Sequence, residues 1–312
     1  MSELSPTAPT SAFVHETVLP EATVDAVAPH AGGLYVDATV GGGGHTARLL
    51  ARSVPDGRVL GFDRDERALA AARERLAAHG ARLALVHAPF GALRAVLSER
   101  GIAHVDGIVA DLGVSSPQLD DAERGFSFMR GGPLDMRMDP SRGETAAELV
   151  ARLDEDALAD VLYEYGEERR SRPIARSIKR AQGDGLLHTT DDLRRAVVRV
   201  LGPRRQGGSD PATRTFQALR IAVNDELGEL RALLEALPEV LADGAVAAII
   251  SFHSLEDRLV KQAFRGDARL EPLTKRPLVA DEDEQARNPR ARSAKLRAAR
   301  RVPRAEGAEV TR

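Results

Sequence analysis

The chain has no cysteine and no tryptophan, and aromatic residues make up 4% of its 312 positions. The lack of cysteine excludes disulfides, thiolate metal sites and cysteine nucleophiles together. Long apolar runs are also missing, because the most apolar stretch, Ala245 to Ile250, has the length of a core strand and not of a membrane span. We therefore expect a cytoplasmic protein that uses no membrane, and the sequence indicates no bound metal.

A strong excess of one charge is missing as well. The formal net charge is -3, so no global basic field indicates nucleic acid, and any such binding must rest on local patches. One such patch is the arginine-dense segment 287–304, which follows the acidic stretch Asp281 to Glu284. Arginine pairs with phosphate through a bidentate fork, and blocks of like charge are often interaction arms. We predict an RNA-binding basic tail here, and a merely solubilising tail is the alternative.

What the chain does have is a glycine-rich stretch after an apolar run that ends in Asp37. Four consecutive glycines, 41–44, follow, and the pattern predicts a buried parallel strand, a loop lying close against a ligand, and a helix from His45. The dinucleotide pattern G-x-G-x-x-G fails, because its third glycine would fall on Thr46. An acidic residue four positions before G-x-G instead resembles S-adenosylmethionine-dependent methyltransferases.

Two further apolar runs also end in carboxylates. The run 59–63 ends in Asp63, whose carboxylate could accept hydrogen bonds from both ribose hydroxyls of an adenosine, and 105–111 ends in Asp111. Between them, a strand over 83–87 leads to Phe90, whose ring could face an adenine or simply be a core aromatic. We therefore predict an α/β fold with a doubly wound, mostly parallel sheet and a ligand site at the carboxyl ends of its strands. A glycine-rich turn without ligand is the alternative.

The pattern breaks after the fourth strand, and a second domain is indicated. Residues 112–143 show no period; their phenylalanines, methionines and arginines suit either a surface that grips an unstacked base or a plug onto the core. From 144 to 201 the period is helical, with Asp154 and Thr190 at plausible N-caps and a cluster of basic residues over 169–180. A long amphipathic helix over 212–237 and a strand over 244–251 then return to the sheet.

These patterns divide the chain into four parts. We predict a disordered N-terminus (1–12), a discontinuous sheet domain (13–142 and 206–286), an inserted all-helical domain (143–205) and the basic tail (287–312).

Several motifs together resemble one family, the bacterial ribosomal RNA small subunit methyltransferase H family. The resemblance covers nearly all of 15–301, and motifs this long and numerous are very specific. The motifs that carry it are Asp-Ala-Thr-Val-Gly-Gly-Gly-Gly-His (37–45), Asp-Leu-Gly-Val-Ser-Ser-Pro-Gln-Leu-Asp (111–120), Arg-Gly-Phe-Ser-Phe (124–128), Pro-Leu-Asp-Met-Arg-Met-Asp (133–139), Tyr-Gly-Glu-Glu-Arg (165–169), Ala-Thr-Arg-Thr-Phe-Gln-Ala-Leu-Arg-Ile (212–221), Ser-Phe-His-Ser-Leu-Glu-Asp-Arg (251–258) and Asn-Pro-Arg-Ala-Arg-Ser-Ala-Lys-Leu-Arg (288–297).

The resemblance implies a class I S-adenosylmethionine-dependent methyltransferase that methylates N4 of a cytidine in the decoding region, the P site, of 16S rRNA in the small ribosomal subunit. The chain departs from the family at Asp210, where a histidine is expected. The family's cofactor contacts fall on Gly43, Gly44, His45, Asp63, Phe90, Asp111 and Gln118.

The chemistry of the target suggests catalytic residues. The lone pair of the cytosine amine is delocalised, so a group that accepts its N–H bonds would favour attack on the methyl group. Asp111 is the first candidate; His253 and Asp257 are secondary ones for holding the base or taking the proton, with helix capping as the alternative for both.

Two other function classes remain open at this stage. A methyltransferase for a small molecule or a protein would not need the basic segments, and a non-catalytic RNA-binding assembly factor would not need Asp111. A nicotinamide enzyme is a distant third. The sequence does not decide whether the protein forms a homodimer.

Overall fold

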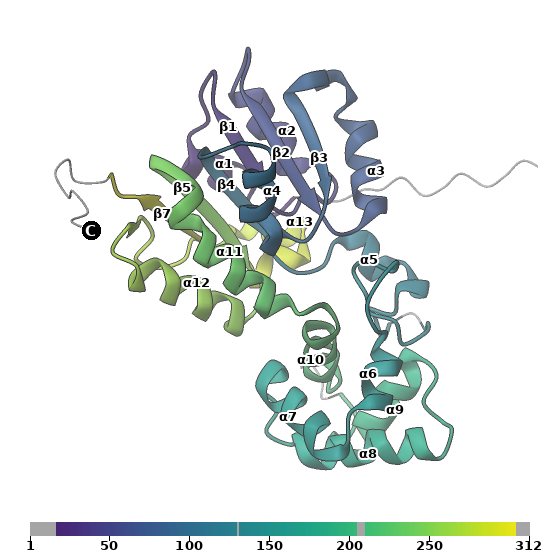
Figure 1. Ribbon diagram of the computed structural model, residues 1–312. Coiled ribbons are helices and arrows are strands. Elements are labelled where there is room, and N and C mark those ends of the chain that lie inside the picture. The colour runs from purple at the N-terminus through teal and green to yellow at the C-terminus, as the bar shows by residue number, and fades with distance from the viewer. Residues whose placement is uncertain (1–16, 130, 205–209, 304–312) are drawn as a thin grey trace, which may run out of the picture.

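A seven-stranded sheet forms the centre of the computed structural model, which describes residues 17–129, 131–204 and 210–303 (Figure 1). The strands lie in the order β3-β2-β1-β4-β5-β7-β6, and the first five are mutually parallel while β7 is antiparallel to both neighbours. This confirms the predicted doubly wound, mostly parallel sheet. The strands are β1 (Leu34–Asp37), β2 (Arg58–Asp63), β3 (Leu83–His87), β4 (Val105–Asp111), β5 (Leu241–Ser251), β6 (Leu270–Pro272) and β7 (Lys295–Arg301).

Helices cover both faces of this sheet because the parallel strands are apolar on both sides. One face packs on α1 (Pro20–Val27) and α2 (Gly44–Arg52). The other packs on α4 (Leu93–Glu99), α11 (Glu226–Val240) and α12 (Ser254–Gly266). Asp65 is the N-cap of α3 (Glu66–Arg75): its carboxylate accepts a hydrogen bond from Arg67 N–H, and the helix contacts β2 and β3. A short helix, α13 (Glu282–Arg287), precedes β7.

The predicted basic tail is part of the sheet. Lys295–Arg301 lies between β5 and β6, so the prediction of a separate arm over 287–312 is wrong for this stretch, while 304–312 lies outside the described residues. Leu296, Ala298 and Ala299 are small or apolar and buried, and this strand pattern is hidden in the sequence by the arginines between them. Arg297 and Arg301 are themselves buried, the first against Asp257 and the second against backbone carbonyls.

The inserted helices form a second hydrophobic core. It is built from α6 (Ala146–Arg152), α7 (Glu155–Gly166), α8 (Ser171–Gly183) and α9 (Thr190–Leu201). Asp154 caps α7 as predicted, but Thr189 and not Thr190 caps α9. The last helix of this core, α10 (Thr213–Asn224), packs on α7, so a stretch that the sequence analysis assigned to the sheet domain shares the core of the inserted one.

The predicted single helix over 212–237 is broken at Asp225. This residue adopts a left-handed conformation (φ 47°) and separates α10 from α11. The buried side chain of Asn224, the last residue before the break, binds the irregular segment 112–143: its Oδ1 accepts from Met138 N–H (2.7 Å) and its Nδ2 donates to Met136 O (2.8 Å). The amphipathic pattern is continuous over 212–237, but α10 packs in the helical core and α11 packs on the sheet, and the chain breaks between them.

The irregular segment serves mainly as packing. It contains α5 (Ser116–Asp120), and Phe126, Met136 and Met138 lie buried in the helical core. Of the two interpretations left open by the sequence, packing onto the core is confirmed for Phe126 and Met136, while Met138 also lines a pocket at the strand ends. Arg124 joins the segment to the sheet domain by donating to Asp65 Oδ2 (2.8 Å), and it also donates to Met138 O (2.8 Å) within the segment itself.

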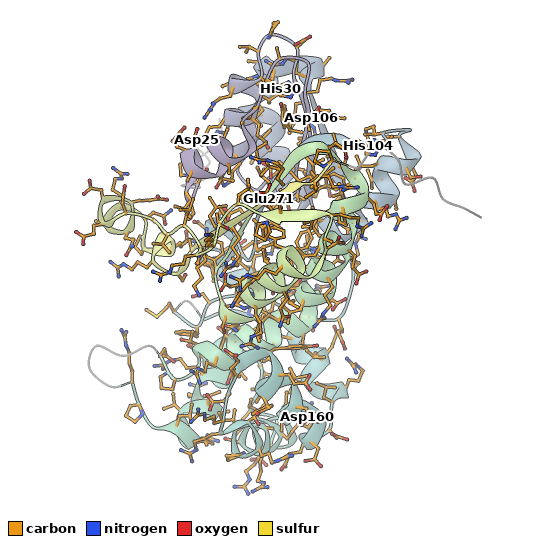
Figure 2. The ribbon with its side chains drawn as sticks, turned by 90° about the vertical axis from the view of Figure 1, so that its left-hand side faces the viewer. Asp25, His30, His104, Asp106, Asp160 and Glu271 are labelled. Atoms are coloured by element: carbon orange, nitrogen blue, oxygen red, sulfur yellow. The ribbon has the colours of Figure 1, made fainter. Side chains whose placement is uncertain are left out.

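The sheet domain and the inserted helical domain meet at the carboxyl ends of the parallel strands. Figure 2 shows His30, His104 and Asp106 at the far end of the sheet, whereas Asp160 of α7 lies at the opposite end of the molecule. The predictions of a disordered 1–12 and of a boundary at 205/206 fall outside the described residues. Within the described ranges, no helix has both the length and the apolar character needed to cross a membrane.

Replacing Asn224 with alanine tests the junction between α10 and the irregular segment. The change leaves a buried N–H and a buried carbonyl without their partner, so we expect a loss of about 2 kcal/mol or more in the free energy of unfolding, measured by denaturant titration. Gln217→Ala in the same helix, which frees only one part-buried carbonyl of Tyr165, is the control and should be milder. Equal losses would contradict the role given to Asn224.

Candidate active site at the carboxyl edge of the sheet

A hollow opens where β1, β2 and β4 end. Asp63 and Asp111, the last residues of β2 and β4, both line it. It encloses about 830 Å³ when the open space at its mouth is included. Its walls are Ala38, Thr39, Gly41, Asp63, Arg64, Ala68, Ala88, Pro89, Phe90, Asp111, Leu112, Gly113, Val114, Ser115, Gln118, Met138, Glu226, Glu229, Leu230, Glu256 and Arg290.

Asp37, at the end of β1, holds the glycine loop in place. It is fully buried and accepts hydrogen bonds from Thr46 Oγ1 (2.6 Å) and Thr39 N–H (3.1 Å). Burial raises the pKa of Asp37 to about 6, and the bond from Thr46 opposes that rise. Asp37 does not line the hollow, so its carboxylate supports the loop from behind.

The glycines of the loop have different structural roles. Gly41 lines the hollow and donates its N–H to Asp63 Oδ2 (2.8 Å). Gly43 begins α2 in a left-handed conformation (φ 76°), and a Cβ on Gly44 would lie 1.7 Å from Thr17 Oγ1. Gly43 and Gly44, both predicted cofactor contacts, are thus required by backbone shape and close packing and are not among the residues lining the hollow.

Asp63 faces the hollow with its carboxylate oriented by backbone donors. Gly41 and Asp65 N–H (2.8 Å) hold its two oxygens, and burial raises its pKa to about 6 against the effect of these bonds. Phe90 lines the same hollow. Gln118 does so too, although its amide is bonded at both ends, to Asp65 Oδ2 (3.0 Å) and to Ser115 N–H (2.9 Å).

Asp111 is the most exceptional group of the site. Its backbone N–H donates to Thr39 Oγ1 (2.6 Å), but its Oδ1 is buried and finds no hydrogen-bond partner among the described residues. Its Oδ2 lies 3.9 Å from Nε2 of the buried His45. Burial raises the pKa of Asp111 to about 7; the charge of Arg290 opposes the rise, and Asp37 and Glu256 add to it.

Arg290 reaches the hollow from a 3₁₀ helix, Pro289–Ser293. It donates to Ser116 Oγ (3.0 Å) and to Val114 O, and its guanidinium lies over the Phe252 ring, 5.7 Å from the ring centroid. These contacts fix the loop that follows Asp111 and bring a positive charge to the site. Sequence analysis assigned Arg290 to an RNA-binding tail and missed its place here.

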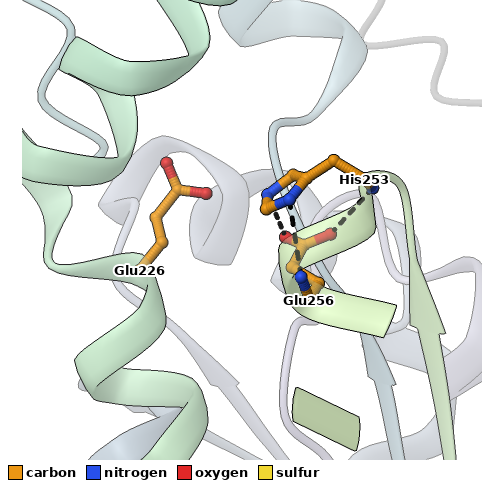
Figure 3. A group of neighbouring side chains, drawn as sticks. All are labelled: Glu226, His253 and Glu256. Carbon is orange, nitrogen blue, oxygen red and sulfur yellow. Dashed lines mark hydrogen bonds and ion pairs between the residues drawn. The ribbon is translucent and has the colours of Figure 1, made fainter. Parts of the chain in front are cut away.

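Three side chains of the kinds that bind metals lie together at the wall of the hollow (Figure 3). One ligand atom each of Glu226, His253 and Glu256 lies within 4.8 Å of the others, which is close enough for a divalent cation. Arg220, however, holds both oxygens of Glu226 (2.7 and 2.9 Å). Protein groups and a salt bridge thus already satisfy much of this cluster.

His253 is the N-cap of α12. It forms a capping box with Glu256, whose Oε2 accepts from Phe252 and His253 N–H and whose Oε1 lies 3.2 Å from His253 Nε2. Burial alone would raise the pKa of Glu256, but the hydrogen bond and charge of His253, with the charge of Arg220, leave it below its ordinary value. Glu256 lines the hollow and His253 stands behind it.

Asp257 is directed toward β7. Its Oδ1 accepts from Arg297 Nε (2.7 Å) and its Oδ2 lies 3.8 Å from Lys295 Nζ, and it is not among the lining residues. The structure therefore brings together four predicted residues, Asp63, Phe90, Asp111 and Gln118, and places His45 next to the third. Gly43, Gly44, His253 and Asp257 support the site from outside the hollow. The lining residues that sequence reasoning missed include Thr39, Glu226, Glu256 and Arg290; three of these four lie inside motifs it had already identified.

Asp257→Ala separates a structural role from a catalytic one. It leaves the Arg297 guanidinium, 8% exposed, without its carboxylate, and we expect a loss of about 3–5 kcal/mol in the free energy of unfolding. Glu271→Ala, which removes the exposed partner of Arg300 in the same strand, should change stability by less than about 1 kcal/mol. A folded, fully stable Asp257→Ala protein would contradict this.

Asp111 should make the stability of the ligand-free protein depend on pH. Because its pKa is raised in the folded state, the folded protein binds more protons than the unfolded one between about pH 4 and 7, and stability falls as pH rises through this range. A pKa difference of one between the folded and unfolded states corresponds to about 1.4 kcal/mol of stability. The fall in melting temperature from pH 5 to pH 8 should be smaller in Asp111→Asn, while Asp160→Asn, at an exposed position, should retain the full slope. Equal slopes in all three proteins would contradict the assignment.

Several known proteins are similar to this chain. A ribosomal RNA small subunit methyltransferase H of Sorangium cellulosum is 61% identical over 292 residues, covering 94% of this chain and 92% of the relative. A protein of the same name from Synechococcus sp. (strain CC9902) is 55% identical, covering 93% and 98%. Among solved structures, an rRNA methylase of Streptococcus thermophilus covers 89% of this chain and 92% of its own, with a TM-score of 0.42 and 13% identity.

A model of a protein family matches nearly the whole chain. The match runs over residues 12–302, and so includes the glycine loop, the inserted helices and β7. The chain belongs to the MraW methylase family.

Proposed function

We propose that this methyltransferase transfers a methyl group from S-adenosylmethionine to N4 of a cytidine in 16S rRNA, in the decoding region of the small ribosomal subunit. Its family and the name shared by its relatives, ribosomal RNA small subunit methyltransferase, support the reaction and the class of RNA. The choice of N4 and of the P site rests on the resemblance of the motifs, and the chemistry of the pocket agrees with an amine as acceptor.

The observation that carries the proposal is the carboxylate of Asp111. Its Oδ1 is buried at the pocket wall with no hydrogen-bond partner among the described residues. A buried acceptor without a donor is unfavourable, so the site is completed by a ligand that brings an N–H or an ammonium group. Both the amine of cytosine and the amino group of the cofactor have this chemistry.

The other residues fit the nucleoside half of the cofactor. Asp63 presents a carboxylate already fixed by Gly41 and Asp65, and would accept hydrogen bonds from the ribose. Phe90 offers a ring to the adenine at the same wall. Gly41, Gln118 and the loop after Asp111 complete the enclosure, whereas Gly43, Gly44 and His45 act by shaping the loop and backing Asp111.

S-adenosylmethionine, when bound, supplies an electrophilic methyl group on a sulfonium. The task of the protein is to present the cytosine amine, whose lone pair is delocalised into the ring. Asp111 would accept an N–H bond of that amine and favour the pyramidal nitrogen that attacks. Positioning two reactants in this way can lower a barrier by roughly 7–11 kcal/mol. No strong base is needed, because the N4 proton becomes acidic once the methyl group has moved from sulfur to nitrogen. The Asp111 carboxylate that accepts this N–H bond would take the proton, and the demethylated cofactor would leave as a thioether.

Glu256 and Arg290 define the acceptor end of the hollow. Glu256 adds a second carboxylate, and Arg290 adds a donor whose charge favours the ionised form of Asp111. His253 and Asp257 would then act through α12, since one caps the helix and the other joins it to β7. We propose that they position the site and do not take the proton.

Nucleoside mass spectrometry of 16S rRNA tests the reaction. Cells that lack the protein should lose N4-methylated cytidine, and the wild-type protein should restore it with isolated small subunits and labelled cofactor. An unchanged nucleoside profile would contradict the target. Free RNA, proteins and small amines tested as acceptors would expose a different substrate class.

Asp111→Asn tests the catalytic role. We expect the rate of methyl transfer to fall by about 100-fold or more, since one preorganised electrostatic contact typically contributes that much. Asp63→Asn should act mainly by weakening cofactor binding in calorimetry. Full activity of the Asp111→Asn protein would contradict the mechanism, and the absence of heat with both the cofactor and its demethylated product would contradict the cofactor site.

A further inference from the structure

Glu167 links the inserted helices to the wall of the active site. It follows α7 and belongs to the motif Tyr165 to Arg169, to which the proposed reaction assigns no role. Its carboxylate accepts hydrogen bonds from Ser254 Oγ and from Arg258 Nη2 (2.9 Å), both on α12 of the sheet domain. Its backbone carbonyl accepts from Arg214 of α10 (3.1 Å). One residue therefore joins α7, α10 and α12.

The backbone at this position is unusual. Glu167 adopts a left-handed conformation (φ 48°), which glycine tolerates best, although the residue before it is Gly166. Gly166 has its own requirement, because a Cβ there would lie 2.7 Å from Arg214 O. Gly166 thus allows α7 to approach α10. The left-handed conformation is adopted by Glu167, whose side chain forms hydrogen bonds with α12. Strain of this kind is retained where a side chain must be aimed.

The rest of the motif anchors Glu167 on the helical side. Gln217 Nε2 donates to Tyr165 O (2.9 Å), and Glu168 Oε1 accepts from Arg170 N–H (2.8 Å) at the start of α8. The hydrogen bonds from Ser254 and Arg258 lower the pKa of Glu167, which keeps it charged near neutral pH. The side chain therefore projects toward α12 from a fixed base.

The helix that Glu167 holds carries part of the pocket wall. Ser254 and Arg258 flank Glu256, which lines the hollow, and His253 caps the same end. On its other side α12 is joined to β7 through Asp257 and Arg297. The first turns of α12 are thus fixed from two directions, by the sheet and by the inserted domain.

We propose that Glu167 is a positioning residue for the RNA acceptor. It fixes the position of the inserted helices relative to Glu256 and Arg290 at the wall of the hollow. An RNA that contacts both the sheet domain and the inserted domain would therefore present its base in a defined geometry. This role rests on the proposed function, because it concerns the same RNA substrate. The cofactor residues Asp63, Phe90 and Asp111 lie on other elements, so cofactor binding should not depend on Glu167.

Steady-state kinetics of Glu167→Gln with isolated small subunits and labelled cofactor test the proposal. We expect KM for the subunit to rise about fivefold, the factor that corresponds to one exposed charge pair, with kcat within about twofold of wild type. Cofactor affinity in calorimetry should be unchanged. Glu155→Gln is the matched control, because it breaks an exposed ion pair with Arg176 that lies wholly inside the inserted domain, and its KM should stay at the wild-type value.

Two further variants keep the test sharp. Ser254→Ala removes one hydroxyl and should raise KM in the same direction, even if Glu167→Gln proves poorly folded. In a double-mutant cycle, Arg258→Ala should add little to the effect of Glu167→Gln, because both remove the same bond. An unchanged KM, or an equal rise in Glu155→Gln, would overturn the proposal. If neither the wild-type protein nor any variant bound the cofactor, the result would instead contradict the proposed function.

Discussion

The structure depends on supplying hydrogen-bond donors to the carboxylates at the ends of its parallel strands. Asp37, Asp63 and Asp111 are all withdrawn from water, and burial raises the pKa of each. The first is satisfied by threonine donors and the second by backbone N–H groups, whereas one oxygen of the third has no hydrogen-bond partner among the described residues. The three acids therefore differ in how far the fold satisfies them: Asp37 is held within the fold, Asp63 is oriented by backbone donors at the wall of the hollow, and one oxygen of Asp111 is left for the donor that the proposed reaction would bring.

The sequence was informative where a local pattern determines the outcome. Apolar runs ending in acids located β1, β2 and β4 and three carboxylates at one edge, because parallel strands with a common direction must place their ends together. It failed where partners are distant. The small residues of β7 were obscured by Arg297 and Arg301, whose charges are neutralised or hydrogen bonded by groups far away in sequence. The break at Asp225 likewise depends on Asn224 meeting Met136 and Met138.

Site residues divide along the same line. Asp63 and Asp111 could be predicted because their position follows from strand ends, while His253 and Asp257 were recognised as important without their direction being known. A residue at the start of a helix can face a pocket, cap the helix or reach a neighbouring strand, and the sequence does not distinguish these. At the start of α12 all three occur close together, at Glu256, His253 and Asp257 respectively. The mutual arrangement of the two bodies through Glu167 was equally beyond any local pattern.

The insertion of β7 between β5 and β6 also constrains how the molecule can fold. Arg290 reaches across 176 positions of sequence to the carbonyl of Val114, and β6 pairs with a strand made after it. Contacts of such separation form late, because the entropy of closing long loops must be met before they stabilise anything. A chain in which Pro289–Ser293 has not yet docked would therefore hold the loop after Asp111 without the hydrogen bonds from Arg290 to Val114 and Ser116.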